Sequence, residues 1–372
     1  MADPAFLTDR LARLRAAGQY RALPGTRAGV DFWSNDYLGF SRLLAEHRPA
    51  AMEHTAPGSR LISGDSGALT DLERDIAAFH GHPAALLFGS GYTANLGLLS
   101  ALGRRGDTII FDALCHASLR DGLRLSGAAA RRFEHNDVGQ CAELLQRSAG
   151  GDGQVFVVTE GRFSMDGDVG PLRDLADLCA RHGAHLIVDE AHSVGLDGPR
   201  GAGMVAALGL QARVLATVVT YGKAPGYHGA AILGSAALRD VLINTCRPFI
   251  FTTGPRPEQI AGWRAVYALL RTEQSAARDR LQRVVDHYRE GIRRRTNLSA
   301  ETTDGPIQLI HLPGNDAVMA AEARLLADGL LVKGIRSPSV KEGQERLRIC
   351  LHAFNTAAEV DRLLEGLSTL NA

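Results

Sequence analysis

Short apolar segments alternate with helix-like segments from Ala84 to Ser235, and this alternation is the dominant pattern of the chain. The apolar segments are "ALLF", "DTIIFD", "QVFVVTEG", "HLIVDEAH", "VLATVVTYGK" and "GAAILGS". Stretches such as "LRDLADLCARHG", with apolar residues at helical spacing, separate them. Strands that alternate with helices build a mainly parallel sheet covered by helices on both faces. The pattern therefore predicts an α/β fold.

The flanking segments predict additional parts. "FLTDRLARLRAAGQYRAL" is amphipathic at helical spacing and precedes a Pro-Gly turn. A long helical stretch from about Pro257 leads to strand-like runs "PIQLIHLPG", "LVKGIR" and "ERLRICLHAF". We expect an N-terminal helical segment at 1–34, a large domain at 35–256, and a linking helix with a small α+β domain at 257–372.

Composition narrows the functional classes. The 372 residues include 41 basic and 41 acidic side chains, and this balance argues against a general nucleic-acid or membrane-surface binder. Five scattered cysteines without a CxxC pair indicate neither a disulfide framework nor a zinc site, so no metal is expected. The chain has no apolar leader or bilayer-length apolar run, which makes a cytoplasmic enzyme the default expectation.

Polar residues lie at or just beyond the ends of several predicted strands. In open parallel sheets, ligands bind beyond the carboxyl ends of the strands. The residues at these ends are Glu160 and Ser164, Asp189 and His192, and Thr220 and Lys223. Because they follow different strands of one sheet, we expect them to share a site.

Lys223 and Asp189 carry the most specific chemistry. Lys223 follows an apolar strand, is one of three lysines, and in a partly desolvated place could act as a Schiff-base nucleophile. Asp189, held on a buried strand, suits the positively charged ring nitrogen of a cofactor, and His192 could reach the same cofactor. An ordinary loop lysine, and an acid and a histidine that cap the next helix, are the alternatives for each residue taken alone.

Two weaker signals fit the same site. Gly89-Ser90-Gly91 opens a predicted helix whose first amides could hold a phosphate, although a simple strand-to-helix turn explains it equally well. His116 follows the next strand and could stack on a flat cofactor, although a lone histidine is more often structural.

Two segments resemble known catalytic motifs, but the rest of the chain lacks the features that those motifs require. "DEAH", Asp189 to His192, resembles a helicase box, but the chain contains no G-x-x-x-x-G-K-[ST] phosphate loop. A helicase-like NTPase is therefore improbable. "SGDSGAL" resembles the nucleophile segment of chymotrypsin-like proteases, which are all-β proteins, whereas this chain is predicted to be α/β.

The combined motifs resemble the α-oxoamine synthases, pyridoxal-phosphate enzymes of the aspartate-aminotransferase fold type. The resemblance covers nearly the whole chain, and the matching segments occur in the family's order. They are "FWSNDYLGF", "GSRLISGDSGALTDLE", "FGSGYTAN", "DALCHASLRDG", "TEGRFSMDGDVGPL", "VDEAHSVGLDGPRGAG", "TYGKAPGYHGA" and "ERLRICLHA". The resemblance implies a fold of type I, in which a large domain has a mainly parallel sheet and a smaller α+β domain follows at the C-terminus.

The resemblance also implies a role for each matching residue. Lys223 would bind pyridoxal 5'-phosphate covalently and act as the catalytic base, while Asp189 would pair with the ring nitrogen and His116 would stack on the ring. Ser164 and His192 would contact the phenolic oxygen of the cofactor, and Gly91, Tyr92 and Thr220 would bind its phosphate. Thr252 and Thr253 of a second subunit would reach the same phosphate.

The substrate would be bound by other residues. Arg21, Asn35 and Arg348 would contact its carboxylate, and Glu160 would lie near the thioester.

The reaction implied is a decarboxylative condensation of L-alanine with a pimeloyl thioester of coenzyme A or a carrier protein, performed by a homodimer. Members that use other amino acids or acyl chains stay open as alternatives. Three positions depart from the usual family pattern, namely Tyr221 and Pro225 in the lysine loop and Leu69, where relatives often carry histidine.

Overall fold

The computed structural model describes residues 5–20, 27–46, 58–295 and 298–371. The chain divides into two compact units. The larger unit comprises 38–164 and 168–278, and the smaller one comprises 1–37, 165–167 and 279–372. The N-terminal segment therefore groups with the C-terminal part, while the functional domains expected at 1–34, 35–256 and 257–372 stay a prediction.

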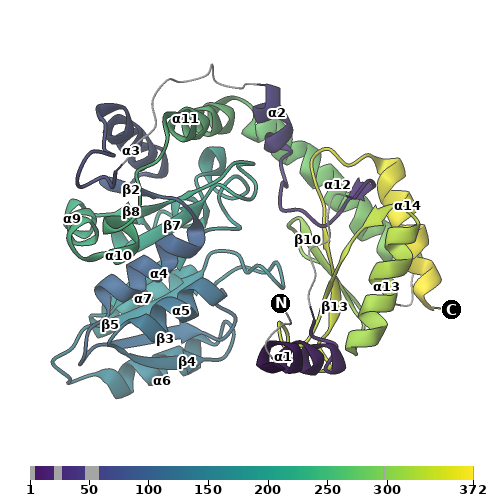
Figure 1. The fold of residues 1–372 in the computed structure, drawn as a ribbon, viewed down its shortest axis with the longest axis horizontal. Helices are drawn as coiled ribbons and strands as arrows, with labels where there is room; N and C mark the ends of the chain where they lie inside the picture. The colour runs from purple at the N-terminus through teal and green to yellow at the C-terminus, as the bar shows by residue number, and fades with distance from the viewer. Residues whose placement is uncertain (1–4, 21–26, 47–57, 296–297, 372) are drawn as a thin grey trace. The chain divides into compact units, whose positions relative to one another are not determined.

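A seven-stranded sheet forms the centre of the larger unit (Figure 1). Its strands are β2 (Ala84–Phe88), β3 (Thr108–Asp112), β4 (Ala129–Phe133), β5 (Val155–Glu160), β6 (His185–Asp189), β7 (Ala216–Thr220) and β8 (Ala230–Gly234), in the order β2-β8-β7-β6-β5-β3-β4. Only β8 runs antiparallel to its neighbours, so the predicted mainly parallel sheet is confirmed. Sequence reasoning missed β4, an edge strand whose first four residues are exposed.

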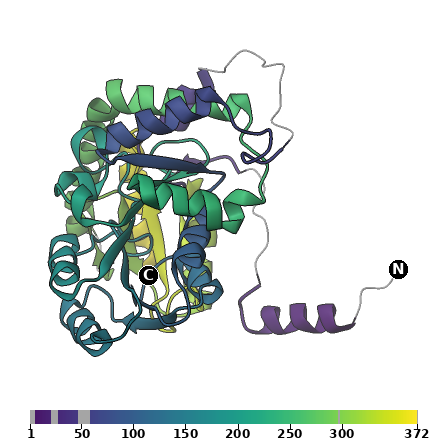
Figure 2. The same cartoon turned by 90° about the vertical axis from the view of Figure 1, so that its left-hand side faces the viewer.

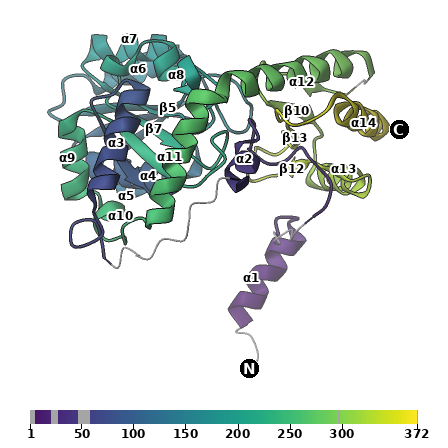
Figure 3. The same ribbon diagram turned by 90° about the horizontal axis from the view of Figure 1, so that it is seen from above.

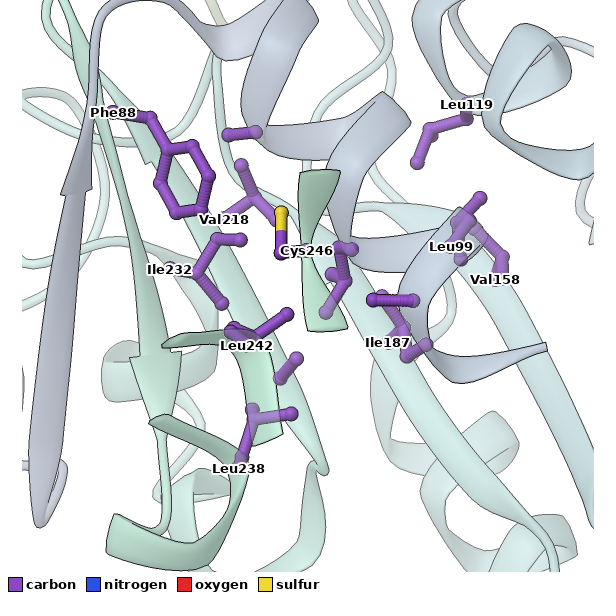
Figure 4. Close-up of a cluster of buried hydrophobic side chains, with 14 of the residues drawn as sticks. Phe88, Leu99, Leu119, Val158, Ile187, Val218, Ile232, Leu238, Leu242 and Cys246 are labelled. Carbon is purple, nitrogen blue, oxygen red and sulfur yellow. The ribbon is translucent and has the colours of Figure 1, made fainter. Parts of the chain in front are cut away.

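Helices cover both faces of this sheet. The helices of the larger unit are α2 (Phe40–Glu46), α3 (Gly67–His80), α4 (Gly91–Leu102), α5 (Ala117–Leu125), α6 (Val138–Ser148), α7 (Leu172–His182), α8 (Met204–Ala207), α9 (Ala236–Thr245), α10 (Arg247–Ile250) and α11 (Pro257–Thr272). Figure 3 shows α6, α7 and α8 on one side of the sheet and α4, α5 and α10 on the other. Each face has its own buried apolar cluster, and Figure 4 shows the one beneath α4. The central strands β3, β5 and β6 contribute buried residues to both clusters and are therefore apolar on both faces, as their sequences indicated.

The long helical stretch after Pro257 consists of two helices rather than one. The first, α11, ends at Thr272, and α12 (Gln274–Arg295) begins after Glu273, whose amide caps α11 by bonding to Leu269 O. Figures 1 and 2 show α11 beside α3, and these two helices are in contact.

The smaller unit has its own sheets and helices, as predicted for an α+β domain. An antiparallel sheet has the order β12-β13-β10-β9, and β1 pairs with β11 in parallel. The elements are α1 (Ala5–Ala16), β1 (Val30–Asp31), β9 (Ala300–Glu301), β10 (Ile307–His311), α13 (Asn315–Ala327), β11 (Leu330–Leu331), β12 (Lys333–Ile335), β13 (Arg346–Cys350) and α14 (Ala357–Ser368). Among the described residues, no helix is both long and apolar enough to cross a membrane.

Candidate active site

Three predicted site residues end three adjacent strands of the large sheet. Glu160, Asp189 and Thr220 are the last residues of β5, β6 and β7, which are neighbours in the sheet. Glu160 and Asp189 are register partners, and all three residues are buried. Parallel strands thus present two carboxyl groups and a hydroxyl at one edge, where α/β folds bind ligands.

A chain of hydrogen bonds joins Asp189 to His116. Asn95 Nδ2 in α4 donates to Asp189 Oδ2 over 2.6 Å and to Ser118 Oγ over 3.0 Å. Ser118 Oγ lies 2.7 Å from His116 Nδ1, and Ala191 N donates to Asp189 Oδ1 over 2.9 Å. The carboxylate of Asp189 is therefore held by two donors, and His116 is oriented from the same network.

Lys223 and Asp189 both act electrostatically on His116. Burial lowers the pKa of His116, the positive charge of Lys223 lowers it further, and the negative charge of Asp189 opposes both effects. The neutral imidazole is therefore the favoured form. A neutral ring is suited to packing against a flat aromatic molecule, because it carries no charge that would have to be desolvated.

Glu160 belongs to the same electrostatic group. Its Oε1 accepts a hydrogen bond from the backbone N–H of His116 over 2.6 Å. Burial raises the pKa of Glu160 well above its usual range and nearby Asp189 raises it further, while the His116 amide and Lys223 oppose the shift. Glu160 therefore favours its protonated, neutral form.

The start of α4 and the end of β7 form a cradle that fits a phosphate group. Ser90 caps α4 by accepting from Thr93 N over 3.2 Å, and a Cβ on Gly91 would lie 2.5 Å from Thr220 Cγ2. Within the described residues, the buried Thr220 Oγ1 makes no hydrogen bond. A helix N-terminus, an unpartnered hydroxyl and a position open only to glycine match the needs of a phosphate ester. The residues present therefore fit pyridoxal phosphate.

The other residues predicted to contact the cofactor differ in how exposed they are. Tyr92 is largely exposed, bonds through its hydroxyl to Asp121, and packs edge-to-face on His116 with 6.4 Å between ring centroids. His192 is buried just beyond β6, and Ser164 is half-buried after β5. Thr252 and Thr253 are exposed between α10 and α11, where Thr253 bridges to Ser59. Their predicted cofactor contacts stay predictions.

Two of the predicted substrate residues, Arg348 and Asn35, are hydrogen-bonded to each other in the smaller unit. Arg348, buried in β13, donates through its NH2 group to Asn35 Oδ1 over 3.1 Å and to Tyr37 Oη over 3.3 Å. Tyr37 Oη also donates to Asn35 Oδ1 over 2.9 Å. Arg348 NH1 also donates to Cys350 Sγ over 3.0 Å, so these bonds fix the orientation of the buried guanidinium, whose forked donors match a carboxylate in geometry. Arg21, which is predicted to contact the same substrate carboxylate, lies outside the described residues.

The three departures from the family pattern are buried in the larger unit. Tyr221 is fully buried, and its hydroxyl lies 3.1 Å from that of Tyr267 in α11. Leu69 is fully buried in α3, and Pro225 is buried in the lysine loop. Tyr221 therefore directs its polar atom toward a helix, and Leu69 is a core residue.

Asn95 and Ser118 are the site residues that sequence reasoning missed. Both are buried on helices beneath the predicted site, and neither follows a strand end. The available signal was a polar residue inside the otherwise apolar run of α4, "ANLGLLSAL". Buried polar groups need partners, so such a residue marks a hydrogen-bond network.

Comparison with protein families gives a match over most of the chain. The aminotransferase class I and II family matches residues 27–367. The 8-amino-7-oxononanoate synthase of Anaeromyxobacter dehalogenans is 42% identical over 351 residues, which cover 93% of this chain and 87% of that protein.

Solved structures agree with this match. A serine palmitoyltransferase structure from S. paucimobilis with a bound pyridoxal-phosphate aldimine has 26% identity and a TM-score of 0.88, covering 99% of this chain and 97% of its own. The 8-amino-7-oxononanoate synthase of Francisella tularensis has 28% identity and a TM-score of 0.75, covering 92% and 97%. The match thus extends from sequence to backbone, over both units of the chain.

Proposed function

The chain belongs to the aminotransferase class I and II family, and from that premise we propose that it is an 8-amino-7-oxononanoate synthase of biotin synthesis. It is a pyridoxal-phosphate-dependent acyltransferase that condenses L-alanine with a pimeloyl thioester and releases carbon dioxide and a thiol. The observation that carries this choice is the 42% identity to such a synthase over 93% of the chain. The segment "SNDYLGF" and the Gly229-Ala230 pair after the lysine loop also resemble this member most.

The cofactor has a complete set of candidate ligands in the larger unit. Lys223 would hold it covalently, Asp189 would pair with its ring nitrogen, and His116 would pack on its ring. Gly91, Tyr92 and Thr220 would bind its phosphate, and Ser164 and His192 its phenolic oxygen. When bound, pyridoxal phosphate supplies a positively charged ring that accepts the electron pair left on the substrate α-carbon.

Proton transfer falls to Lys223. In its neutral form, the Lys223 amine takes the proton from the α-carbon of the amino acid and returns a proton at the end of the cycle. Glu160, the register partner of Asp189, favours its protonated form because burial raises its pKa. The charge of Asp189 then stabilises positive charge placed opposite it, and Asn95 holds the carboxylate in position.

We predict substrate contacts for Arg348, Asn35, Arg21 and Glu160. We assign the amino-acid carboxylate to Arg348, whose guanidinium is oriented by Asn35 and Tyr37. Arg21 would contribute a second positive charge, and Glu160 a polar contact near the thioester. The arginine fork matches a carboxylate in geometry as well as in charge.

Assembly and location are part of the same proposal. We expect a homodimer working in the cytoplasm, with Thr252 and Thr253 of one subunit reaching the phosphate in its partner. Their exposure is consistent with an intersubunit role. The acyl donor is a thioester of coenzyme A or of a carrier protein.

The cofactor assignment is tested with purified protein. We expect a visible absorption band from bound pyridoxal phosphate, and a borohydride-reduced adduct that maps to Lys223 and is absent from Lys223→Ala. A colourless protein that takes up no pyridoxal phosphate would contradict it.

Substrate choice is tested by thiol release with alanine, glycine and serine, each paired with several acyl thioesters. Alanine with pimeloyl thioester should be the preferred pair. If another pair turned over while this one did not, the chain would be a different α-oxoamine synthase, such as a 2-amino-3-ketobutyrate ligase, 5-aminolevulinate synthase, serine palmitoyltransferase or aminoketone-signal synthase.

A further inference from the structure

Tyr37 contacts two of the residues that we assign to the substrate carboxylate, Asn35 and Arg348. Its side chain is fully buried in the structure. Its hydroxyl accepts from Arg348 NH2 over 3.3 Å and donates to Asn35 Oδ1 over 2.9 Å. Because Tyr37 has no exposed surface, it does not contact a ligand itself and acts only through these neighbours.

The chemistry of arginine fixes the direction of these hydrogen bonds. A guanidinium carries N–H donors and no acceptor. The end of the Asn35 amide that lies 3.1 Å from Arg348 NH2 must therefore be the oxygen, not the nitrogen. The Tyr37 oxygen also accepts from Arg348, so the proton of this hydroxyl is donated to Asn35 Oδ1. Two donors thus converge on one amide oxygen.

This arrangement leaves the nitrogen end of the Asn35 amide for a ligand. Across the described part of the chain, Asn35 Nδ2 makes no hydrogen bond, and the residue is only half-buried. An amide nitrogen offers N–H donors, which are what a carboxylate requires. An amide turned over would instead present its oxygen to the anion and its N–H groups to the donors of Arg348.

Backbone and ring contacts hold Tyr37 in place. Cys350 N donates to Phe32 O over 2.8 Å, and Ala353 N donates to Tyr37 O over 2.7 Å. The Tyr37 ring stacks on that of His352, with 6.5 Å between the centroids. A hydroxyl on a ring fixed in this way loses little conformational entropy when it orients a neighbouring group.

We propose that Tyr37 is a positioning residue, which holds the Asn35 amide in the orientation where Nδ2 donates to the carboxylate of the amino-acid substrate. This inference rests on the proposed function, in which Asn35 and Arg348 bind that carboxylate. Without the hydroxyl, Asn35 Oδ1 loses one of its two donors and Arg348 loses an acceptor. The pair must then be ordered when the ligand binds, which weakens binding.

Steady-state kinetics of Tyr37→Phe give the first test. KM for L-alanine should rise about 10-fold, as for the loss of a hydrogen bond, while kcat and KM for the thioester change by less than about twofold. Tyr288→Phe is the matched control, because Tyr288 is fully buried in the same unit and, within the described residues, its hydroxyl makes no hydrogen bond. It should leave all three constants unchanged. A wild-type KM for L-alanine in Tyr37→Phe would overturn the proposal.

A binding titration separates positioning from packing and needs no turnover. Holoenzyme without thioester is titrated with L-alanine and with L-alaninamide, in which a neutral amide replaces the carboxylate, and binding is followed by absorbance. Tyr37→Phe should weaken L-alanine binding about 10-fold and leave L-alaninamide binding unchanged. Equal weakening of both ligands would show that Tyr37 only supports the packing of the unit, contrary to the proposal.

A double-mutant cycle tests whether Tyr37 acts through Asn35. Asn35→Ala removes the amide, so adding Tyr37→Phe to it should weaken L-alanine binding little further. Losses that multiply in the double variant would mean that the two side chains act independently, and the positioning role would then be wrong.

Failure of this inference can be told apart from failure of the proposed function. If the wild type bound glycine or serine in place of alanine, the proposed function would be wrong, and the same comparison of that amino acid with its amide would still test Tyr37. If alanine and pimeloyl thioester react but Tyr37→Phe binds alanine as the wild type does, only the role of Tyr37 is refuted.

Discussion

Replacing Asn95 with leucine tests whether the hydrogen-bond network beneath the site supports catalysis. Leucine keeps the volume and the helix of α4 but removes two donated bonds, one to the Asp189 carboxylate at 2.6 Å and one to the Ser118 hydroxyl at 3.0 Å. A bond to a charged group contributes about 1.5–3 kcal/mol and a neutral one about 0.5–1.5 kcal/mol. We therefore expect the free energy of unfolding to fall by about 2–4 kcal/mol, measured by denaturant titration of the cofactor-free protein.

The same substitution should impair the reaction, because Asp189 loses one of its two donors and His116 loses its link to that carboxylate. We expect kcat to fall roughly 10- to 100-fold and the affinity for pyridoxal phosphate to weaken, measured by thiol release and cofactor titration. Ser100→Ala is the matched control, since it removes a 3.2 Å bond to Gly97 O in the same helix without touching the network. If Asn95→Leu and Ser100→Ala had the same kcat and cofactor affinity, the network would have no catalytic role.

Three further substitutions address the cofactor cradle and the pH dependence of stability. Asp189→Asn should lower kcat on the order of 100-fold or more in a protein that still folds, because it removes the charge opposite the cofactor ring, and unchanged turnover would refute that role. Gly91→Val should weaken pyridoxal phosphate binding in equilibrium dialysis, since its Cβ would lie 2.5 Å from Thr220 Cγ2, and wild-type affinity would contradict the phosphate cradle. Burial opposes the charge of His135, but hydrogen bonds with Asp112 and Asp168 raise its pKa to about 10. The charged form of His135 should therefore stabilise the fold fully below the unfolded-state pKa near 6.5, and this stabilisation should be lost as the pH rises toward 10. His135→Gln should lower the free energy of unfolding strongly at pH 6 and little at pH 10. Equal losses at both pH values would exclude a charged His135.

The architecture of the larger unit was predictable because its information is local. Strands buried on both faces must be continuous apolar runs, and the helices between them must carry apolar residues at helical spacing. The apolar runs of the strands and the helical spacing of apolar residues can both be recognised within a short stretch of sequence. β4 escaped prediction because, as an exposed edge strand with Arg131 and Arg132, it has little apolar surface to bury.

The site was predictable only in part. Glu160, Asp189 and Thr220 could be found because parallel strands align their carboxyl ends at one edge of the sheet. Asn95 reaches Asp189 across 94 positions, a contact set by how α4 packs on the sheet and not by any local pattern. The pairing of β1 with β11, which ties the N-terminal segment to the smaller unit, is equally non-local.

The stoichiometry of the reaction tests the central claim most directly. Enzyme supplied with carboxyl-labelled L-alanine and heptanedioyl-coenzyme A should release labelled carbon dioxide and free thiol in equal amounts, with a product of the mass of 8-amino-7-oxononanoate. Thiol release without labelled carbon dioxide, or no release with this pair while another amino acid or thioester reacts, would contradict the account.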